Sequence, residues 1–340
     1  MTTQLFEPIQ IDKERLLPIY EEALKNGRKI DLTDISREDW LQLRNIIGLG
    51  ATDVSPILGL NRYKTAFQLW KEKVSDEIKS VDNKFTRWGN LLQPPIIEEY
   101  ERMTLRKTVE DKYMRIHPEH NFLYADLDGI VKDADGKLIG AVECKSTVSS
   151  VYKSWEKNPD DCPQGIPLEH YCQVMHQFAC VPQLEWIDIA VLILDQREVE
   201  IKRIVPDWEY IKKQTDAVAK WYNTYVVPMV APPMTAYEYE YAEPHLGSIV
   251  EASDEIAEKV NKLKEKKEIL KGVEKEIKDL ENDIKEHIGE HESLVYAGEV
   301  LATWKQQKRE FVDNKTLKEQ EPKVYERFKK ITEFRVLRLK

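Results

Sequence analysis

The sequence predicts an α/β protein with a central mixed β-sheet flanked by helices, followed by a long C-terminal helix and a small α+β appendage. First, the apolar period along residues 1–235 changes from the three- and four-residue spacing of helices to the two-residue spacing of strands and back. Second, the order helix, hairpin, helix, strand, strand is typical of a mixed sheet. Third, residues 253–287 combine heptad-like apolar spacing with dense Lys and Glu. Prolines interrupt the pattern near residue 235, so we expect domains at 1–235 and 236–340.

Local signals define the elements of the first domain. Short helices are expected over residues 39–73, broken at the turn-like Gly48-Leu-Gly50 and Gly59-Leu-Asn61. A helix is expected after Gly89, with Pro94-Pro95 in its first turn or at a kink. Two strands joined by a turn are expected at 122–131 and 137–147, followed by a helix at 167–181. Two further strands are expected at 186–194 and 199–205, and a helix at 207–225.

The second domain begins with the long helix and its narrow apolar seam. The seam consists of Ile256, Val260, Leu263, Leu270, Val273, Ile277, Leu280 and Ile284. It can pack on its own chain, pair with another chain or dock a partner, while Gly272 and a Lys at a skipped seam position weaken a free-standing coiled coil. Beyond it we expect strands at 293–304 and 334–339 around a helix at 314–330. Residues 304–340 carry twelve Lys and Arg against six Asp and Glu, a local excess of +6.

Composition bounds the class of protein. With 340 residues and 41% hydrophobic side chains, the chain can bury a substantial core, which excludes a wholly disordered protein. The net charge of −10 argues against nucleic-acid binding only if charge is spread evenly, and the basic tail indicates that it is not. Four cysteines without a C-x-x-C pair suit a reducing compartment. The first residues lack the apolar stretch of a secretory signal and the longest apolar run, 189–194, is too short to span a bilayer, so we expect a cytoplasmic protein.

Two carboxylates and a lysine in the predicted hairpin form the candidate catalytic constellation. Asp126 and Asp128 are two residues apart and are expected on one strand, projecting to one face. Glu143 and Lys145 share a face of the next strand, with Cys144 on the other face. Antiparallel pairing brings two hard oxygen ligands and a cation together, which suits Mg²⁺ or Mn²⁺ at a phosphate, with the lysine orienting or deprotonating water. An exposed hairpin with ordinary surface acids gives the same spacing.

Four blocks of sequence widen this constellation. They are Gly50-Ala-Thr-Asp-Val-Ser-Pro-Ile-Leu-Gly-Leu-Asn-Arg-Tyr63 with Leu69-Trp70, Trp88-Gly-Asn-Leu-Leu-Gln-Pro-Pro-Ile96, Leu127-Asp-Gly129 with Val142-Glu-Cys-Lys145, and Ile166-Pro-Leu-Glu-His-Tyr-Cys-Gln-Val-Met-His-Gln177. In order and spacing, over about residues 40–225, the chain resembles the phage lambda exonuclease branch of the PD-(D/E)xK nuclease superfamily, also called the YqaJ viral recombinase family. The resemblance implies a restriction-endonuclease-like core.

The resemblance implies roles for the hairpin residues. The acid before Gly and the Glu of the E-x-K pair bind metal in that family, and the Lys is the general base, which corresponds to Asp128, Glu143 and Lys145. The backbone carbonyl of Cys144 is a further metal ligand by the same resemblance. Gln173, in the Y-x-Q block, is expected to position the catalytic lysine or DNA, although a plain helix-surface amide is the other interpretation. The implied cofactor is Mg²⁺, for which Mn²⁺ can substitute.

The resemblance also implies a pocket for a 5′-terminal phosphate. Thr52 stands at a family Ser position and keeps the hydroxyl, and Arg44 is the expected arginine, one residue further away than in the family pattern. A guanidinium fork binds two phosphate oxygens and a hydroxyl donates a third bond. Arg62 and Lys64 are the alternatives, and Arg44 as a solvated helix residue is the plain interpretation.

One position departs from the family pattern. The second block usually reads G-x-x-x-E and supplies a further metal carboxylate, whereas this sequence has Gln93. The amide keeps the shape but removes a negative charge, so a second metal should bind less tightly. Either the natural protein works with fewer carboxylates or the residue was substituted to trap substrate. Some relatives hold an iron–sulfur cluster, but the wide spacing of these cysteines favours ordinary buried thiols.

The resemblance implies a Mg²⁺-dependent exonuclease that digests one strand of linear duplex DNA 5′→3′ and leaves 3′ tails for phage-type homologous recombination. It also implies a ring-shaped homotrimer and a single-strand annealing protein as partner, in the cytoplasm of a bacterial host carrying the phage or prophage. An endonuclease or helicase-linked nuclease of the same superfamily is one alternative. A catalytically weakened DNA-end-binding protein, favoured by Gln93, is a second. A partner-binding module in residues 236–340 that defines the biology is a third.

Overall fold

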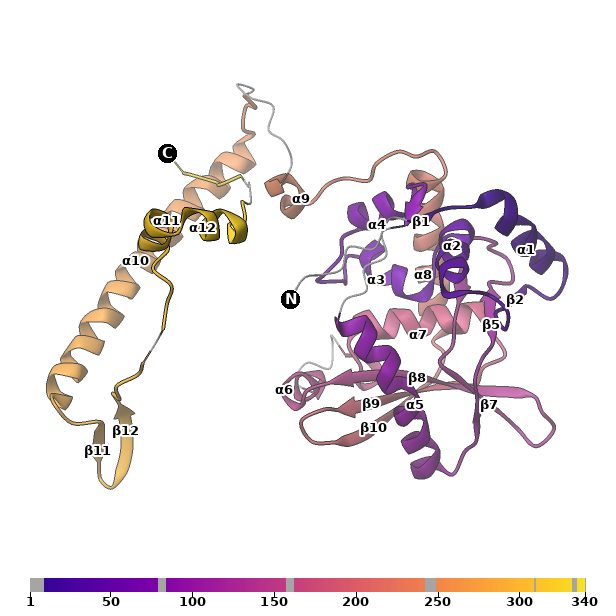
Figure 1. Cartoon of the computed structure of the whole chain (residues 1–340), viewed down its shortest axis with the longest axis horizontal. Helices are drawn as coiled ribbons and strands as arrows, with labels where there is room; N and C mark the ends of the chain where they lie inside the picture. Colours follow the sequence, from indigo (N-terminus) through magenta and orange to yellow (C-terminus); the bar gives the residue numbers. More distant parts are fainter. Residues whose placement is uncertain are drawn as a thin grey trace. The chain divides into compact units, whose positions relative to one another are not determined.

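The computed structural model describes residues 9–78, 84–156, 162–241, 249–308, 310–331 and 335–339. The chain divides into two compact units, Met1–Thr235 and Ala236–Lys340, each with its own helices and strands (Figure 1). Within the described ranges, every helix is too short or too polar to cross a membrane.

A five-stranded mixed sheet forms the centre of the first unit. Its strand order is β10-β9-β8-β7-β4, and β8 and β9 are parallel while the other neighbours are antiparallel. The strands are β4 (Thr108–Val109), β7 (Gly129–Lys132), β8 (Leu138–Thr147), β9 (Trp186–Ile193) and β10 (Glu198–Ile204). The predicted fold class, a mixed sheet flanked by helices with a long C-terminal helix, is confirmed.

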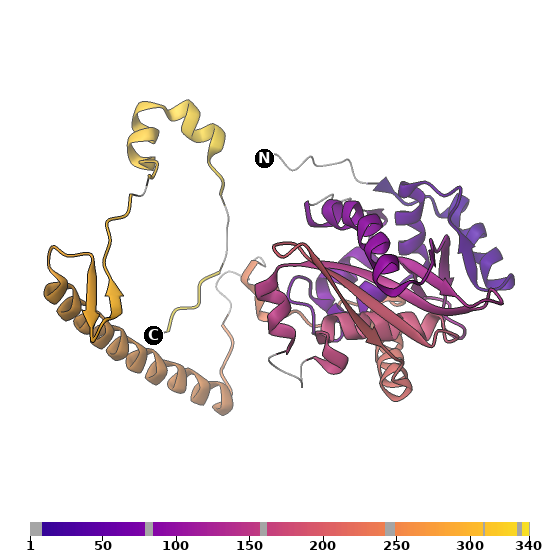
Figure 2. The same ribbon diagram turned by 90° about the horizontal axis from the view of Figure 1, so that it is seen from below.

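Helices cover both faces of this sheet (Figure 2). Strand residues alternate between the faces, so Val142 packs with Ile96 and Tyr100 of α5 (Lys84–Thr104) on one side. Ala141 lies in the core on the opposite side, where α7 (Leu168–Cys180) and α8 (Trp208–Trp221) supply most of the helical surface. A π-turn, Tyr222–Val226, extends α8 to about the predicted end.

Close packing in the sheet depends on a glycine at one position. Gly140 of β8 pairs in register with Trp186 of β9. A Cβ atom at residue 140 would lie 2.3 Å from the Trp186 ring, so the indole occupies the space that a side chain would need.

A second, smaller sheet carries much of the N-terminal region. It pairs β2 (Lys29–Asp31), β5 (Tyr113–Ile116) and β6 (Tyr124–Ala125), and α1 (Lys13–Lys25) and α2 (Arg37–Ile47) pack against it. Its core consists mainly of Leu16, Ile30, Leu43, Ile47, Met114 and Tyr124. Beyond α2, the predicted short helices are the 3-10 turn Ala51–Asp53, α3 (Val54–Ile57) and α4 (Ala66–Lys73). The remaining pieces are β1 (Ile9–Gln10), β3 (Glu77–Ile78), α6 (Ser149–Tyr152) and the 3-10 turns Lys153–Glu156 and Pro163–Gly165.

Two predictions about this unit are corrected. The helix expected after Gly89 is present but already begins at Lys84, so Pro94 and Pro95 lie in its interior, on its exposed side, and not in its first turn. Packing of Ile96 and Tyr100 on the sheet holds the helix through the prolines despite the missing backbone donors. The strand expected at 122–131 is two strands in different sheets, β6 and β7, separated by a bend.

The second unit consists mainly of α10 (Asp254–Ile288), one residue off the predicted range at each end. The strand expected at 293–304 is a hairpin, β11 (Ser293–Tyr296) and β12 (Glu299–Thr303), because Ala297 and Gly298 both adopt positive φ and reverse the chain. The remaining helices are α9 (Ala236–Tyr241), α11 (Asn314–Gln320) and α12 (Pro322–Phe328).

Two further expectations for this unit are corrected. The helix expected at 314–330 is divided because Pro322 cannot continue α11 and instead begins α12. Residues 335–339 do not form the expected strand, and residue 334 lies outside the described residues.

Candidate active site

Strand β8 places the candidate catalytic pair. Glu143 and Lys145 are two residues apart and therefore face the same side of the sheet, toward α7. Cys144 faces the opposite side and packs with the α5 cluster, as predicted. Strand β7 begins at Gly129, opposite Val142, so the stretch of β8 beyond residue 142 has no ladder partner on the β7 side. This opening leaves room for side chains beside the sheet.

Glu143 is the centre of a buried hydrogen-bond network. Its Oε1 atom accepts hydrogen bonds from Lys145 Nζ at 2.7 Å and from Gln173 Nε2 at 2.7 Å. Lys145 Nζ also donates to Gln173 Oε1 at 3.0 Å, which closes a ring of three side chains. Burial disfavours the Lys145 ammonium, but Glu143 and Asp128 outweigh it and raise the pKa of Lys145. The lysine is therefore held as a cation.

A residue that the sequence analysis did not single out completes this network. Gln177 Nε2 donates to Glu143 Oε2 at 2.6 Å, so both carboxylate oxygens are bonded to α7 amides. Gln177 lies four residues after Gln173, hence on the same helix face. The four-residue spacing between Gln173 and Gln177, inside the last sequence block, could have predicted that both amides face the same site.

Asp128 lies immediately before β7 and faces the same opening. Its Oδ2 atom accepts a hydrogen bond from the Cys144 backbone N–H at 2.8 Å, in place of the missing ladder partner. The N–H and C=O of one strand residue point to the same side, so the Cys144 carbonyl also faces Asp128. Burial, together with the negative charge of Glu143, raises the pKa of Asp128 to about 7. The two carboxylates thus share one buried space.

Gln93 lies on α5, which covers the sheet face opposite α7, and its side chain approaches Asp128. Its Nε2 atom lies 3.4 Å from the Asp128 backbone oxygen, a long hydrogen bond. In the described part of the chain, no three His, Cys, Asp or Glu side chains gather as a metal-binding group. Mg²⁺ needs only one or two carboxylates because waters and substrate phosphates complete its shell. The raised pKa of Asp128 indicates buried negative charge that a cation would neutralise, so this donor set fits one divalent ion.

Arg44 and Thr52 lie side by side. An Arg44 terminal nitrogen lies 3.5 Å from Thr52 Oγ1, and Arg44 Nε donates to the Tyr124 hydroxyl at 2.9 Å. A buried ion pair of 2.8 Å between Lys73 and Asp53 fixes the loop that carries Thr52. Burial opposes the charge of Arg44, but neighbouring Tyr124 and acidic groups outweigh it and raise its pKa. The guanidinium is thus charged and held in place beside an exposed hydroxyl.

Arg62 and Lys64 have different surroundings. Lys64 Nζ forms a 2.7 Å ion pair with Glu72, so its charge is already compensated. The Arg62 guanidinium lies 5.8 Å from the centre of the Tyr63 ring. Burial, with smaller contributions from the charges of Lys145 and Arg62, lowers the pKa of His170 in α7 to about 3. Among the residues that the structure describes, neither Arg62 nor Lys64 has a hydrogen bond or ion pair with Arg44 or Thr52.

The bend between β6 and β7 links the two groups of residues. Asp126 and Asp128 were expected on one strand and one face, but the bend separates their surroundings. Asp126 is near Arg44 and Trp40, and burial raises its pKa to about 6. Asp128 instead bonds to Cys144. Tyr124, which holds Arg44, is thus only four residues before Asp128.

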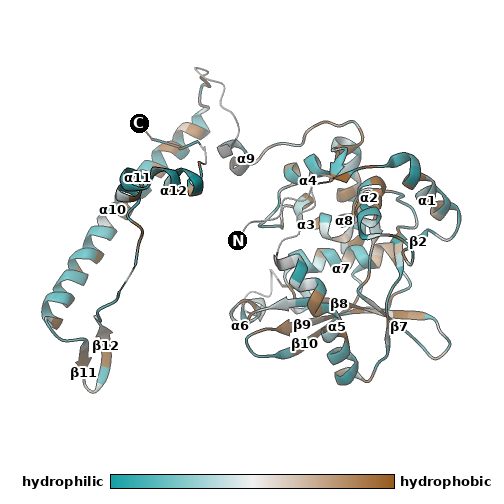
Figure 3. Ribbon diagram, in the orientation of Figure 1, coloured by the Kyte–Doolittle hydropathy of each residue, from teal (hydrophilic) through white to brown (hydrophobic). Residues whose placement is uncertain are grey.

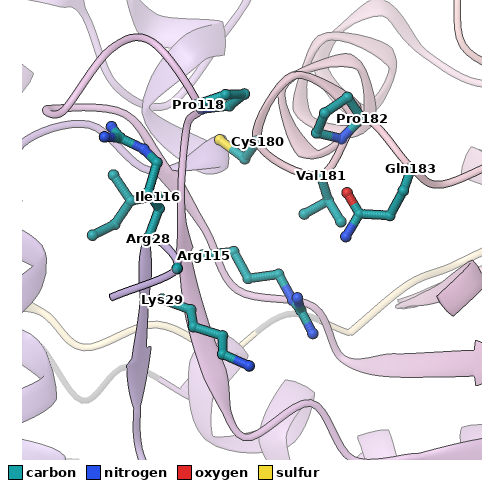
Figure 4. Close-up of a pocket in the computed structure, with 10 residues that line it drawn as sticks. Arg28, Lys29, Arg115, Ile116, Pro118, Cys180, Val181, Pro182 and Gln183 are labelled. Carbon is teal, nitrogen blue, oxygen red and sulfur yellow. The ribbon is translucent and has the colours of Figure 1, made fainter. Parts of the chain in front are cut away.

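A separate basic cavity of about 210 Å³ lies at the C-terminal end of α7 (Figure 4). Its cations already have neighbours: Arg28 donates to the His117 carbonyl, Arg115 pairs with Asp111, and Lys29 lies over a tyrosine ring. The carbonyl end of a helix carries partial negative charge, which itself favours cations there. None of the predicted site residues lines this cavity.

Comparisons with known proteins identify the family. Residues 39–182 match the model of the YqaJ-like viral recombinase domain. Over 312 residues the chain is 31% identical to the uncharacterized protein YqaJ of Bacillus subtilis (strain 168), covering 89% of this chain and 94% of that protein. The chain therefore belongs to the YqaJ-like viral recombinase family, as the four sequence blocks predicted.

Solved structures with some similarity include two exonucleases. The alkaline exonuclease LHK-Exo from Laribacter hongkongensis matches with a TM-score of 0.45 and 20% identity, covering 57% of this chain and 94% of that one. A phage related exonuclease from Haemophilus somnus 129PT matches with a TM-score of 0.39 and 15% identity, covering 55% of this chain and 99% of that one.

Proposed function

We propose that this protein is a metal-dependent DNA exonuclease that hydrolyses one strand of linear duplex DNA from its 5′ end. The observation that carries the proposal is the buried ring of Glu143, Lys145 and Gln173 beside Asp128. Arg44, beside Thr52, donates a hydrogen bond to Tyr124, which lies four residues before Asp128 on the same short chain segment. Membership of a viral recombinase family supports DNA as the substrate. The product would be a 3′ single-stranded tail used in phage-type homologous recombination.

The carboxylates of Asp128 and Glu143 and the carbonyl of Cys144 would hold Mg²⁺, or Mn²⁺ in its place. When bound, the ion supplies positive charge to the scissile phosphate and lowers the pKa of water. Lys145 Nζ, held as a cation by Glu143, orients the attacking water and stabilises the charge that develops on the phosphate oxygens. Gln173 keeps that ammonium group in place.

Arg44 and Thr52 would bind the terminal 5′ phosphate. The guanidinium offers paired donors and the hydroxyl a third bond, a set that suits a terminal phosphate. Arg62 would contact the DNA backbone. This arrangement would make the reaction start at an end and not within a strand.

The expected assembly follows the family resemblance. We infer a homotrimeric ring that encircles DNA, and a single-strand annealing protein that loads on the exposed 3′ tail. The protein would act in the cytoplasm of a bacterial host, on phage or prophage DNA.

Digestion of three matched substrates tests the proposal: linear duplex with 5′ phosphates, the same duplex with 5′ hydroxyls, and closed circular duplex. With Mg²⁺ we expect rapid loss of the first, slow loss of the second and no cleavage of the third. Nicking of the circle would instead favour an endonuclease of the same superfamily. Lys145→Ala is expected to abolish digestion while end binding persists.

Gln93 favours a second candidate, a DNA-end-binding protein with weakened catalysis. The amide stands where the family has a carboxylate and its nitrogen, not a carboxylate oxygen, approaches Asp128. Restoring the charge with Gln93→Glu distinguishes the two. If the natural protein and Gln93→Glu both bind ends but cleave nothing with either Mg²⁺ or Mn²⁺, the binding protein is correct.

A further inference from the structure

An uncovered apolar column runs along α10. Ile256, Leu263, Leu270, Ile277 and Ile284 recur at intervals of seven residues, and each side chain is between 38% and 55% exposed. In Figure 3, α10 is coloured mostly as hydrophilic, with separate hydrophobic segments along its length. Helices that pair as coiled coils carry apolar residues at two positions of each seven-residue repeat. In α10 the second position is apolar at Val260, Val273 and Leu280 and is interrupted by Lys266 and Lys267.

The described residues of the second unit cover this column only at its C-terminal end. There the β11–β12 hairpin approaches Ile284, and Ile288 is just 3% exposed. An isolated polar helix gains most of its stability from packing an apolar face. At 1.5 Å per residue, α10 is about 52 Å long. Most of that length therefore needs a cover from outside the unit.

The charges flanking the column indicate what the cover is. Residues 259–271 contain six Lys and two Glu, a net charge of +4. Residues 274–286 contain six Asp and Glu and three Lys, a net charge of −3. These two thirteen-residue halves of the stretch 259–286 flank Gly272-Val273, whereas the start of α10 carries Asp254, Glu255 and Glu258 and lies outside the pattern. Over residues 259–286 the helix is thus complementary to its own reverse.

We propose that α10 pairs with α10 of a second copy of this chain as an antiparallel two-helix coiled coil. In this orientation the basic half of each helix faces the acidic half of the other, and the apolar columns meet. A parallel pair would place like charges together along its whole length, which is unfavourable. The two helices would be related by a two-fold axis near their midpoints. Three equivalent chains cannot all pair two by two within one ring, so the pairing would join each chain of one homotrimeric ring to a chain of a second ring. It does not depend on nuclease activity.

The mass of the full chain in solution tests whether the column is the interface. Leu270→Asp with Ile277→Asp places charges in the column, and Lys275→Asp is the matched control off the column. By sedimentation velocity we expect the double variant to have half the mass of the natural protein and of the control. Equal mass for the natural protein and the double variant overturns the proposal. A natural protein that does not self-associate, and whose apolar column binds only a different protein, also overturns it.

Charge reversal tests the orientation without touching the column. A variant with Lys264, Lys266 and Lys267 changed to Glu, and Glu276, Asp279 and Glu281 changed to Lys, has both halves reversed. An antiparallel pair predicts that this variant associates with itself as well as the natural protein does, but does not mix with it. Each half-reversed variant should fail to self-associate. A fully reversed variant that mixes with the natural protein would show parallel pairing and overturn the proposal.

Discussion

At the scale of single residues, Glu143 shows how a buried carboxylate is held in one orientation. Three donors, from Lys145, Gln173 and Gln177, hold its two oxygens in one orientation. Two of these donors are neutral amides, so they fix the carboxylate without neutralising its charge. Lys145 already balances one negative charge, so the excess buried negative charge arises because Asp128 lies beside the same pair, and we expect the amides to matter for rate more than for DNA binding.

Removing the Gln177 amide should slow catalysis without weakening DNA binding. Gln177→Leu leaves Glu143 Oε2 without its donor. Losing one hydrogen bond to a charged group costs about 1–2 kcal/mol, so we expect a fall in kcat of roughly tenfold with KM for DNA unchanged. Gln183→Leu, at an exposed position beyond α7, is the control. Steady-state digestion of labelled duplex measures both, and equal kcat values for the two variants would exclude a positioning role.

His117 should make the fold less stable in mild acid. Its Nδ1 atom accepts hydrogen bonds from the backbone N–H groups of Glu119 and His120, which only the neutral ring can do. Burial is the main cause that lowers its pKa from 6.5 to about 4. Between these values the unfolded chain binds a proton that the folded chain does not, so stability falls as pH falls through that range.

The size of this effect can be measured by urea unfolding at a series of pH values. The slope from His117 is at most about 1.4 kcal/mol per pH unit between the two pKa values. His117→Asn keeps an acceptor but cannot be protonated, so its unfolding free energy should depend less steeply on pH. Identical slopes in the natural protein and the variant would contradict the assignment.

At the scale of elements, the β6–β7 segment connects the two halves of the site. Tyr124 at one end holds Arg44, and Asp128 at the other end belongs to the carboxylate pair. The segment leaves one sheet and enters the other, so the two sheets together fix the spacing of the two groups. The two groups lie beside different sheets. We therefore expect that a substitution at Arg44 or Thr52 can weaken 5′-phosphate binding while the hydrogen bonds around Glu143 and Lys145 stay intact.

Changing Thr52 should alter end preference more than intrinsic cleavage. Thr52→Val removes the hydroxyl beside Arg44 but keeps the shape of the side chain. Losing one bond to a terminal phosphate costs about 1–2 kcal/mol, so the preference for 5′-phosphorylated over 5′-hydroxyl duplex should fall roughly tenfold. Thr52→Ser should retain the preference. An unchanged preference in Thr52→Val would remove Thr52 from the phosphate site.

The β8–β9 pairing should be sensitive to a single added methyl group. Gly140→Ala places a Cβ atom 2.3 Å from the Trp186 ring, which must move. Overpacking of this kind costs about 1–3 kcal/mol, so the unfolding free energy should fall by that amount. Gly89→Ala, in a helix where the Cβ atom meets nothing within 4 Å, should instead stabilise slightly. Urea unfolding compares them, and equal effects would mean that the sheet yields freely at Trp186.

At the scale of the whole molecule, sequence signals predicted the elements that bury long periodic faces. The sheet strands β8, β9 and β10 and helices α7 and α10 have such faces and were predicted within a few residues. The two-residue strands β4 and β6 have none, because tertiary pairing alone defines them. The break at β6 also explains why Asp126 was misplaced, since a period of two cannot reveal where a strand changes sheets.

The site divides in the same way. Asp128, Glu143, Lys145 and Gln173 were predicted together because one hairpin and one sequence block carry them. The structure joins Glu143, Lys145 and Gln173 by hydrogen bonds, and Asp128 bonds to the backbone of Cys144, which lies between Glu143 and Lys145. Gln177 was missed because an amide has no spacing rule of its own. Lys64 was a candidate only by charge, and its ion pair with Glu72 depends on where α4 folds back. Charge alone does not locate a side chain.

The net charge of −10 acquires a different meaning at this scale. Part of it belongs to buried carboxylates that a metal would neutralise, and part lies along α10, where twelve acids accompany nine lysines between Glu251 and Glu286. A nuclease needs positive charge only where it contacts the DNA backbone. An acidic total is thus compatible with a DNA-acting enzyme.

The central claim is that Lys145 and its carboxylate neighbours hydrolyse DNA from an end. A timed digestion of end-labelled, 5′-phosphorylated linear duplex with Mg²⁺, comparing the natural protein with Lys145→Ala, tests it most directly. The account predicts progressive shortening from the 5′ end by the natural protein, none by the variant, and equal binding of duplex ends by both. Equal digestion by the two proteins would contradict the account.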